Sequence, residues 1–336
     1  MGTDQFAGLE RYVVEVASEQ SRRGHHVSVV GGDPASMQRL LTPAVEWHPG
    51  ATPRDALRAL VRQGRRDVVH SHITKADFVA LAAAPVNRGR RFSTRHLTAP
   101  RGHGPRAQRL APLVRRALHR EIAVSRFVSD EVRPASDVVL LNGVREQPDT
   151  SPDRQHVVLM AHRLAPEKDT ETGIRAWALS GLADRGWTLV IAGHGAERDP
   201  LEQLARELGV ADSTDFVGWL PDPTDAFRTS GVLLAPALAE PCGLSILEAM
   251  SFGLPVVASA SGGNPETVGT AAGATLFPAG DANAAADHLR ALADDPTRRA
   301  TYGRELQELQ RAEFSLGVHV DRLTEVYQRG EWGGPR

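Results

Sequence analysis

Two glutamates, Glu240 and Glu248, flank a short segment that predicts a turn followed by the start of a helix. The free amides in the first turn of a helix carry partial positive charge and suit a phosphate, so Gly243, Leu244 and Ser245 are candidate phosphate-binding residues. Glu240, in the turn, is placed to reach a sugar hydroxyl, and Glu248 to accept both hydroxyls of a ribose. Two acids alone fit an ordinary turn and a solvated helix face equally well.

A cationic counterpart occurs at Arg163 and Lys168, which bracket a proline-containing loop directly after the predicted strand 156–160. Lysine is scarce, since only Lys75 and Lys168 occur among the 39 lysines and arginines. An ammonium is a compact point charge and a guanidinium a planar fork, so a retained lysine suggests a specific role. Two cations at the carboxyl end of a strand suit the neutralisation of a departing diphosphate. The alternative is a pair of exposed surface cations.

Glycines follow two further predicted strands. Gly193 and Gly195 come directly after one strand, where the lack of a side chain allows close approach of a ligand to the backbone. They do not form the GxGxxG sequence of dinucleotide-binding enzymes, which disfavours a dehydrogenase. The next strand ends at Gly218, Trp219 and Leu220, which we interpret as a wall for a nucleobase.

The first half of the chain carries weaker candidates. Gly8 precedes a predicted helix, whose first amides could face a phosphate. His70, His72 and His96 lie at the ends of predicted strands, although a lone histidine is more often structural than catalytic. No metal-binding sequence such as HExxH occurs, and 222–225 is only a loose form of an Asp-x-Asp pattern, so we predict no obligatory metal.

Strand and helix patterns alternate along the whole chain, which is typical of parallel α/β architecture. The turn-rich stretch 145–153 predicts a linker between an N-terminal domain, 1–145, and a C-terminal domain, 154–315. A C-terminal helical segment, 316–336, is expected to cross back to the N-terminal domain. Doubly wound sheets bind ligands at the carboxyl ends of their strands, so two such Rossmann-like domains facing across a cleft could hold two substrates.

The two predicted domains differ at their first strand. The C-terminal domain opens with the apolar strand 156–160, whereas the N-terminal domain opens at 1–8 with a sequence typical of the loop after such a strand. We therefore expect the first strand of the N-terminal domain to be missing, through a start assigned too far downstream or a shortened chain. A domain that naturally lacks that strand would carry a gap in its core.

Composition excludes several classes of protein. No apolar run approaches the roughly 20 residues of a membrane span, no signal-peptide pattern is present, and the single Cys242 leaves no disulfide framework, so we predict a cytoplasmic protein. Residues 1–145 carry about 23 Lys and Arg against about 13 Asp and Glu, and the remainder is acidic. The basic half suits an anionic acceptor or the inner face of a membrane, or it simply attracts the acidic half.

The basic segment 105–120 predicts an amphipathic helix. The simpler interpretation is a surface helix that packs Leu110, Leu113, Val114 and Leu118 into its own domain. The alternative is a helix that rests on an anionic membrane surface.

Taken together, these residues resemble glycosyltransferase family 4, whose members are retaining enzymes of the GT-B fold. Glu240 and Glu248 match its E-x7-E element, and Arg163 and Lys168 match its R-x4-K element. The loop Gly262-Gly-Asn-Pro-Glu266 resembles the GG-x-PE turn of the family.

The resemblance runs over nearly the whole chain. Leu141-Asn-Gly-Val144 is similar to the hinge segment of the family. One departure lies at 7–11, where alanine stands in place of the first glycine of the Gly-Gly-x-Glu-Arg opening.

The resemblance implies that Arg163 and Lys168 bind the donor diphosphate and stabilise its departure, that Glu240 contacts the transferred sugar and Glu248 the ribose, and that His96 lies beside the donor sugar. It implies a retaining transferase that moves a hexose-like sugar from a nucleoside-diphosphate sugar to a small-molecule or lipid-linked acceptor, with no metal, cofactor or nucleic acid. The alternatives are a nucleotide-sugar epimerase of the same fold and an inactive nucleotide-sugar-binding protein.

Overall fold

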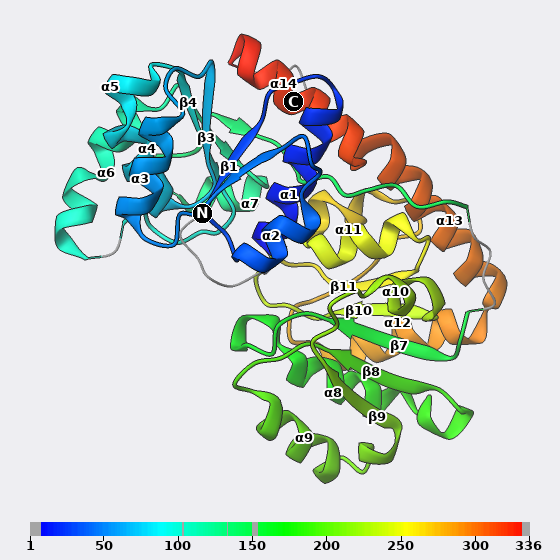
Figure 1. The fold of residues 1–336 in the computed structure, drawn as a ribbon. Coiled ribbons are helices and arrows are strands. Elements are labelled where there is room, and N and C mark those ends of the chain that lie inside the picture. Colours follow the sequence, from blue (N-terminus) through cyan, green and yellow to red (C-terminus); the bar gives the residue numbers. More distant parts are fainter. Residues whose placement is uncertain (1–7, 103, 133, 150–153, 331–336) are drawn as a thin grey trace. The chain divides into compact units, whose positions relative to one another are not determined.

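The computed structural model describes residues 8–102, 104–132, 134–149 and 154–330 (Figure 1). The described residues divide into two compact units. Unit 1 takes its residues from Met1–Val144 and Leu316–Arg336, and unit 2 from Arg145–Ser315. The predicted linker 145–153 lies partly, at 150–153, outside the described residues.

Unit 2 is built around one parallel sheet of six strands in the order β12-β11-β10-β7-β8-β9. Most of its strand residues are apolar and buried on both faces of the sheet, as expected of a parallel sheet covered by helices. The chain steps outward from β7 to β9 and then returns to place β10 beside β7. The strands are β7 (Val157–Ala161), β8 (Thr188–Ala192), β9 (Thr214–Gly218), β10 (Val232–Ala235), β11 (Val256–Ser259) and β12 (Thr275–Phe277).

The helices of unit 2 start where the sequence offers caps. Asp169, Asp281 and Asp295 each accept a hydrogen bond from a backbone N–H in the first turn of the helix that follows. Trp177 is fully buried on the first of these helices. The helices are α8 (Thr170–Ser180), α9 (Arg198–Glu207), α10 (Thr224–Thr229), α11 (Leu244–Ser251), α12 (Ala282–Asp294) and α13 (Pro296–Glu313).

Unit 1 has two separate parallel sheets, β1-β2 and β3-β4-β5-β6. Its described part contains no strand ahead of the first helix, α1 (Gly8–Arg22). The strands are β1 (Ser28–Val30), β2 (Glu46–His48), β3 (Val68–Ser71), β4 (Arg90–Arg95), β5 (Arg120–Ala123) and β6 (Val138–Val139).

The C-terminal helix α14 (Leu316–Arg329) belongs to unit 1 and packs on α1. Val320 and Leu323 of α14 join Tyr12 and Val13 of α1 in one apolar cluster. The other helices of the unit are α2 (Pro34–Leu40), α3 (Pro53–Arg62), α4 (Thr74–Ala82), α5 (Ala84–Asn87), α6 (Pro105–Ala117) and α7 (Arg126–Glu131).

The exposure of side chains on helix α6 contradicts one prediction from the sequence. Val114 and Leu118 are buried as expected, but Leu110 and Leu113 are 50% and 60% exposed. The expectation that all four leucine and valine side chains pack into the domain is therefore wrong, because amphipathic periodicity identifies an apolar face without showing that the fold covers all of it. Along the described ranges, no helix has both the length and the apolar character needed to cross a bilayer.

Candidate active site

A pair of oppositely charged side chains in unit 2 forms where the loops after β7 and β10 meet. The ammonium group of Lys168 pairs with the carboxylate of Glu240, and the two side chains are only 16% and 15% exposed. The backbone N–H of Gly243 donates a second hydrogen bond to this carboxylate, at 3.1 Å. Because β7 and β10 are neighbours at the point where the strand order reverses, the pair lies at the topological switch point of the sheet, where open α/β sheets bind ligands.

Backbone contacts hold the loops around this pair together. Leu238 N–H donates to the carbonyl of Glu167 at 3.0 Å, which joins the loop after β10 to the loop after β7. Gly263 N–H donates to the carbonyl of Glu240 at 2.7 Å, which adds the loop after β11. Gly262 has a φ of 60°, and a Cβ there would lie 2.1 Å from the Glu240 carbonyl oxygen. Glu240 is therefore fixed at its backbone as well as at its carboxylate.

Arg163 is not part of this ion pair. Its guanidinium donates to the carboxylate of Glu167 at 2.6 Å, and its side chain is 60% exposed. The structure therefore brings Lys168 and Glu240 together but turns Arg163 toward Glu167, four residues ahead on the same loop.

The glycines after β8 allow the loops to touch. A Cβ on Gly193 would lie 1.9 Å from the carbonyl oxygen of His162, and a Cβ on Gly195 would lie 1.9 Å from that of Leu164. Leu164 N–H also donates to the carbonyl of His194 at 2.9 Å. These glycines thus allow the loop after β8 to lie directly against the backbone of the loop after β7, which carries Lys168.

The loop after β9 presents an exposed aromatic side chain. Gly218, with a φ of 75°, ends the strand, and its carbonyl accepts from Gly193 N–H at 2.8 Å. Trp219 is 54% exposed and Leu220 is half-buried. An indole in this position offers a flat face to an aromatic ligand.

Helix α11 begins directly after the ion pair. Gly243 precedes its first residue in the left-handed region, with a φ of 73°, and Leu244 and Ser245 form the first turn. Their side chains are half-buried, as is that of Glu248 on the second turn. The positive end of this helix therefore lies beside the Glu240 carboxylate.

Sequence reasoning missed two buried neighbours of the site. Asn264 is fully buried, and its amide donates to the Ser259 carbonyl at 3.0 Å. The Nε2 atom of His162 lies 3.0 Å from the Thr170 hydroxyl; burial, followed by the charge of Lys168, lowers the pKa of this imidazole to about 3. His162 directly precedes Arg163, and Asn264 lies in the loop Gly262–Glu266. The spacing of these two residues gave no indication that they lie beside the site.

The remaining predicted site residues, Gly8 and His96, lie in unit 1. Gly8 is the exposed first residue of α1. His96 Nε2 lies 3.3 Å from His72 Nδ1, and its ring packs edge-on against Tyr12. Burial and then the nearby His319 lower the pKa of His96 to about 3, so its imidazole is neutral at neutral pH.

His70 joins the same cluster. Its Nδ1 lies 2.6 Å from the Tyr327 hydroxyl, and its Nε2 lies 2.8 Å from the Thr94 hydroxyl. The structure thus gathers His70, His72 and His96, which the sequence presented separately, and adds His319 of α14 to them. In the described part of the chain, no group of three His, Cys, Asp or Glu side chains has the arrangement of a metal site.

Comparison with known proteins assigns the two parts of the chain. The family model described as Glycosyltransferase Family 4 matches residues 6–145, and the model described as Glycosyl transferases group 1 matches residues 145–308. A GDP-mannose-dependent monoacylated alpha-(1-6)-phosphatidylinositol monomannoside mannosyltransferase of Corynebacterium glutamicum is 32% identical over 189 residues, which cover 54% of this chain and 48% of the relative.

Other relatives align over more of their length. A D-inositol 3-phosphate glycosyltransferase of Thermobispora bispora is 27% identical over 392 residues, covering 97% of this chain and 90% of the relative. The chain spans about half, or less, of the length of the first curated relatives that it matches.

Solved structures show the same fold. Anabaena HepE in complex with UDP and glucose superimposes with a TM-score of 0.80 at 20% identity, covering 98% of both chains. The predicted α/β architecture and the predicted resemblance are thus confirmed. With two family models matching end to end from residue 6 to residue 308, the chain belongs to the family 4 glycosyltransferases of the GT-B fold.

Proposed function

We propose that the protein is a glycosyltransferase that uses a nucleoside-diphosphate sugar as donor and binds this donor on unit 2. The observation that carries the proposal is the Lys168–Glu240 pair at the switch point between β7 and β10, beside the positive end of α11. The cation can bind the diphosphate of such a donor, and the fixed carboxylate can accept hydrogen bonds from its sugar hydroxyls. The first amides of the helix can bind further phosphate oxygens.

In this proposal the cations of the loop after β7 act on the diphosphate. Lys168 binds it and stabilises the negative charge that grows as it departs. Arg163 leaves its ion pair with Glu167 and binds the phosphate instead. This exchange costs little, because an exposed i,i+4 ion pair is worth only about 0.3–0.5 kcal/mol. The first-turn amides of Leu244 and Ser245 bind further phosphate oxygens.

The other side chains orient the rest of the donor. Glu240 accepts hydrogen bonds from the transferred sugar, Glu248 from the ribose, and Trp219 stacks on the nucleobase. His96, neutral at neutral pH, serves as a hydrogen-bonding partner of a substrate hydroxyl rather than as a cation.

We propose transfer with retention of configuration. The bond between the anomeric carbon and the phosphate oxygen breaks, and the acceptor oxygen forms a new bond to that carbon on the same face. The proton of the acceptor hydroxyl passes to the departing phosphate. The chain offers two cations for the charge on this phosphate, which is the basis for proposing that no divalent metal is needed.

For the acceptor, the proposal is a lipid-linked or small hydroxylated molecule. The Corynebacterium relative is named for a phosphatidylinositol monomannoside and the Thermobispora relative for an inositol phosphate. Helix α6 exposes Leu110 and Leu113 beside Arg109 and Arg116, a combination that suits the anionic surface of a membrane. This surface supports a peripheral membrane contact and, through it, a lipid-linked acceptor.

The test begins with thermal-shift measurements against UDP-, GDP-, ADP- and dTDP-sugars, because a bound ligand raises the unfolding temperature. Turnover of the sugar that binds is then compared in Glu240→Gln, Lys168→Met and the control Glu171→Gln, which alters an exposed ion pair of the same unit. We expect each site variant to lose about 10²–10³-fold in rate and the control to lose nothing.

Other outcomes would assign a different function. Full activity in both site variants would reject the proposed site. Product formed without an acceptor would identify an epimerase, and binding without turnover an inactive binding protein. The anomeric configuration of the product, measured by NMR, tests retention, and turnover in excess chelator tests the independence from metal.

A further inference from the structure

The carboxylate of Glu240 has a protein partner on each of its oxygens. Its Oε2 atom pairs with the ammonium group of Lys168, and its Oε1 atom accepts from Gly243 N–H at 3.1 Å. An ionised carboxylate has about four acceptor positions, so about two of them remain for further donors. Both side chains of the pair keep a small exposed part, through which a ligand can reach them.

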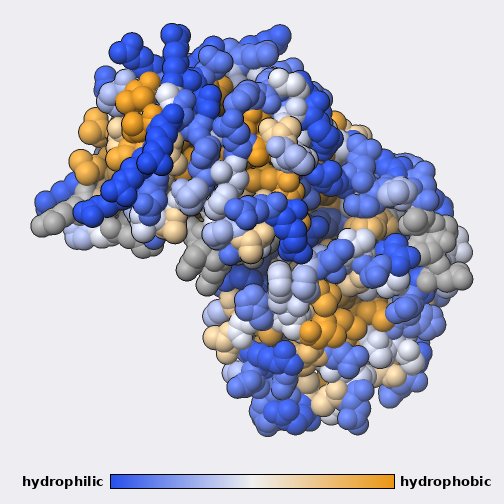
Figure 2. Space-filling model, viewed as in Figure 1, coloured by the Kyte–Doolittle hydropathy of each residue, from blue (hydrophilic) through white to orange (hydrophobic). Residues whose placement is uncertain are grey.

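Ion pairs on the outer helices of unit 2 are more exposed. On α9, for example, Arg198 pairs with Glu202, and the face of α9 that Figure 2 shows is mainly hydrophilic. Water screens such pairs, so each contributes little to stability or binding. The Lys168–Glu240 pair is shielded over most of its surface. Its charges therefore act more strongly on each other and on any ion that binds beside them.

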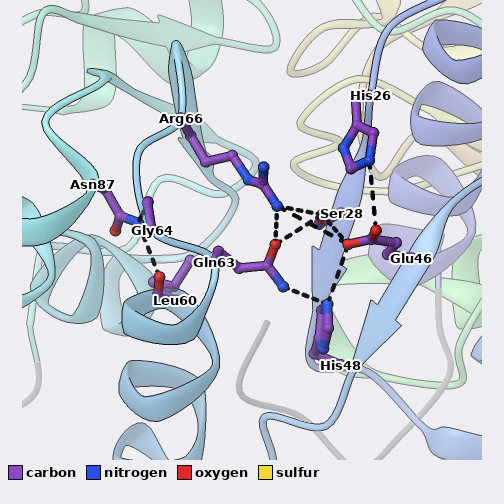
Figure 3. Close-up of polar contacts among 9 residues, drawn as sticks. All are labelled: His26, Ser28, Glu46, His48, Leu60, Gln63, Gly64, Arg66 and Asn87. Carbon is purple, nitrogen blue, oxygen red and sulfur yellow. Dashed lines mark hydrogen bonds and ion pairs between the residues drawn. The ribbon is translucent and has the colours of Figure 1, made fainter.

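The ammonium group of Lys168 also differs from a cation in a purely structural cluster. Figure 3 shows such a cluster in unit 1, where the guanidinium of Arg66 donates to Ser28 at 3.4 Å and to Gln63. In the described part of the chain, the ammonium of Lys168 has one acceptor, the carboxylate of Glu240. Because an ammonium carries three donors, two N–H groups of Lys168 are left for a ligand.

Glu240 cannot withdraw when an anion binds beside it. Its carbonyl accepts from Gly263 N–H at 2.7 Å, and the backbone of Gly262 lies directly against it. At the other end of the residue, Gly243 N–H holds the carboxylate. The negative charge of Glu240 is therefore fixed in place at the start of α11.

The charge of Glu240 lies next to the amides that are expected to bind phosphate. The N–H of Gly243 is already used by the carboxylate, which leaves the first-turn amides of Leu244 and Ser245. Consecutive Cα atoms are about 3.8 Å apart. A phosphate on these amides therefore lies within a few ångström of the Glu240 carboxylate.

The intact donor and the nucleoside diphosphate left after transfer differ at this point. In the donor, the terminal phosphate carries the sugar, whose hydroxyl groups can donate to a carboxylate. After transfer, the oxygen that held the sugar is an ionisable oxygen of the phosphate, and such a group loses its second proton at a pKa of about 6. At neutral pH the spent diphosphate therefore has more negative charge and no sugar hydroxyl.

Taking unit 2 as the donor-binding unit proposed above, we infer that Glu240 shifts the affinity of the site toward the intact donor and away from the spent nucleoside diphosphate. With the donor, the carboxylate accepts from the sugar while Lys168 binds the diphosphate. With the spent diphosphate, the carboxylate has no sugar donor, stays on Lys168 and repels the added charge. This role of Glu240 in product release is additional to its contact with the transferred sugar.

The experiment measures dissociation constants by calorimetry at pH 7.5. UDP, GDP, ADP and dTDP are compared with the corresponding glucose compounds, first in the wild type. Glu240→Gln removes the charge and keeps the shape of the side chain. We expect this variant to bind the nucleoside diphosphate about tenfold more tightly and its sugar compound more weakly. The control Glu171→Gln removes a charge from an exposed pair and should change neither constant.

Two further variants separate charge from shape. Glu240→Asp keeps the charge, so it should not tighten binding of the nucleoside diphosphate. Lys168→Met leaves the carboxylate without its cation, so the nucleoside diphosphate should lose about threefold more affinity than the sugar compound, or more. The ratio of the two dissociation constants thus moves in opposite directions in Glu240→Gln and Lys168→Met, which a merely structural role of the pair would not produce.

The possible failures are distinguishable. If none of the eight compounds binds the wild type, the proposed function is wrong, and the role of Glu240 in release is wrong with it. If nucleotides bind but Glu240→Gln weakens or tightens both kinds of ligand equally, only the role in release is overturned. Tighter binding of the nucleoside diphosphate by Glu240→Asp would overturn it too. Unfolding temperatures of all variants show which of them are folded, and Lys168→Met tests the same ratio where Glu240→Gln is not.

Discussion

The sheets of the two units differ in continuity. In unit 2 the strand at the switch point, β7, has a ladder on each side, with β8 and with β10. In unit 1 the described strands form two separate sheets, β1-β2 and β3-β4-β5-β6. At the carboxyl end of β7 the neighbouring loops hold one another, and Lys168 and Glu240 meet. In unit 2, the pairing of β7 with β8 and β10 thus brings together the loops that carry Lys168 and Glu240.

The two units also differ in how they hold their titratable side chains. Unit 2 places one cation and one carboxylate in contact, so that each neutralises the other. Unit 1 gathers four histidines, and burial as the first cause lowers the pKa of each of them: to about 3 for His70 and His96, to about 4 for His319, and well below the usual value for His72. The contrast holds for these two clusters, since unit 1 also buries the ion pairs of Arg101 with Asp77 and Glu121, and unit 2 also buries the neutral His162.

The largest effect expected from this difference is a loss of stability of unit 1 in acid. Between the folded pKa values, near 3 to 4, and the unfolded value of 6.5, the unfolded chain binds protons that the folded cluster excludes. Stability is therefore full above about pH 7 and falls as the pH drops toward 4. Each histidine adds up to about 1.4 kcal/mol per pH unit to the slope. Hydrogen exchange followed by peptide should show unit 1 opening before unit 2.

A matched variant isolates one member of the cluster. His319 Nδ1 lies 2.8 Å from the carbonyl of Leu141 and its Nε2 lies 2.8 Å from the Tyr12 hydroxyl, contacts that a glutamine amide can reproduce. His319→Gln should therefore reduce the acid slope while leaving stability at pH 8 nearly unchanged. An unchanged slope, or unit 2 opening first, would contradict the interpretation of the cluster.

A smaller effect is expected at the glycine contacts of unit 2. Gly193→Ala would place a Cβ 1.9 Å from the His162 carbonyl and force the loops after β7 and β8 apart. We expect a loss of about 1–3 kcal/mol in the free energy of unfolding, measured in urea. Gly181→Ala is the control, since its φ of 64° is unfavourable but no atom lies within 4 Å of the new Cβ. Amide exchange in 162–168 should rise in the first variant alone; a rise in both would argue against a specific loop contact.

Much of unit 2 could be predicted from the sequence because its central strands are continuous apolar runs. The charged residues of the site could be recognised as well, since Lys168 is one of two lysines and Glu240 follows a buried strand. Their contact could not, because they are 72 residues apart and meet only through the pairing of β7 with β10. The strand order is a property of the whole sheet rather than of any local pattern.

The sequence was less informative for unit 1. Strand β2 has three residues, Glu46–His48, too few for a periodic signal to stand out. The histidine cluster depends on α14, which brings His319 and Tyr327 back to residues near the start of the chain. Taken alone, His70, His72 and His96 were each interpreted as more often structural than catalytic, and only the fold shows that they lie together with His319.

The smallest expected effect is the difference between enlarging a buried alanine in the packed core of unit 2 and enlarging one beside a cavity in unit 1. Ala249 on α11 is fully buried in unit 2, and Ala249→Leu should cost about 1–3 kcal/mol because the added methyl groups have nowhere to go. Ala17 on α1 is nearly as buried but lines a cavity of about 910 Å³ in unit 1, so Ala17→Leu should change the free energy of unfolding by less than about 1 kcal/mol, in either direction. Equal costs in urea unfolding would mean that the cavity closes in solution.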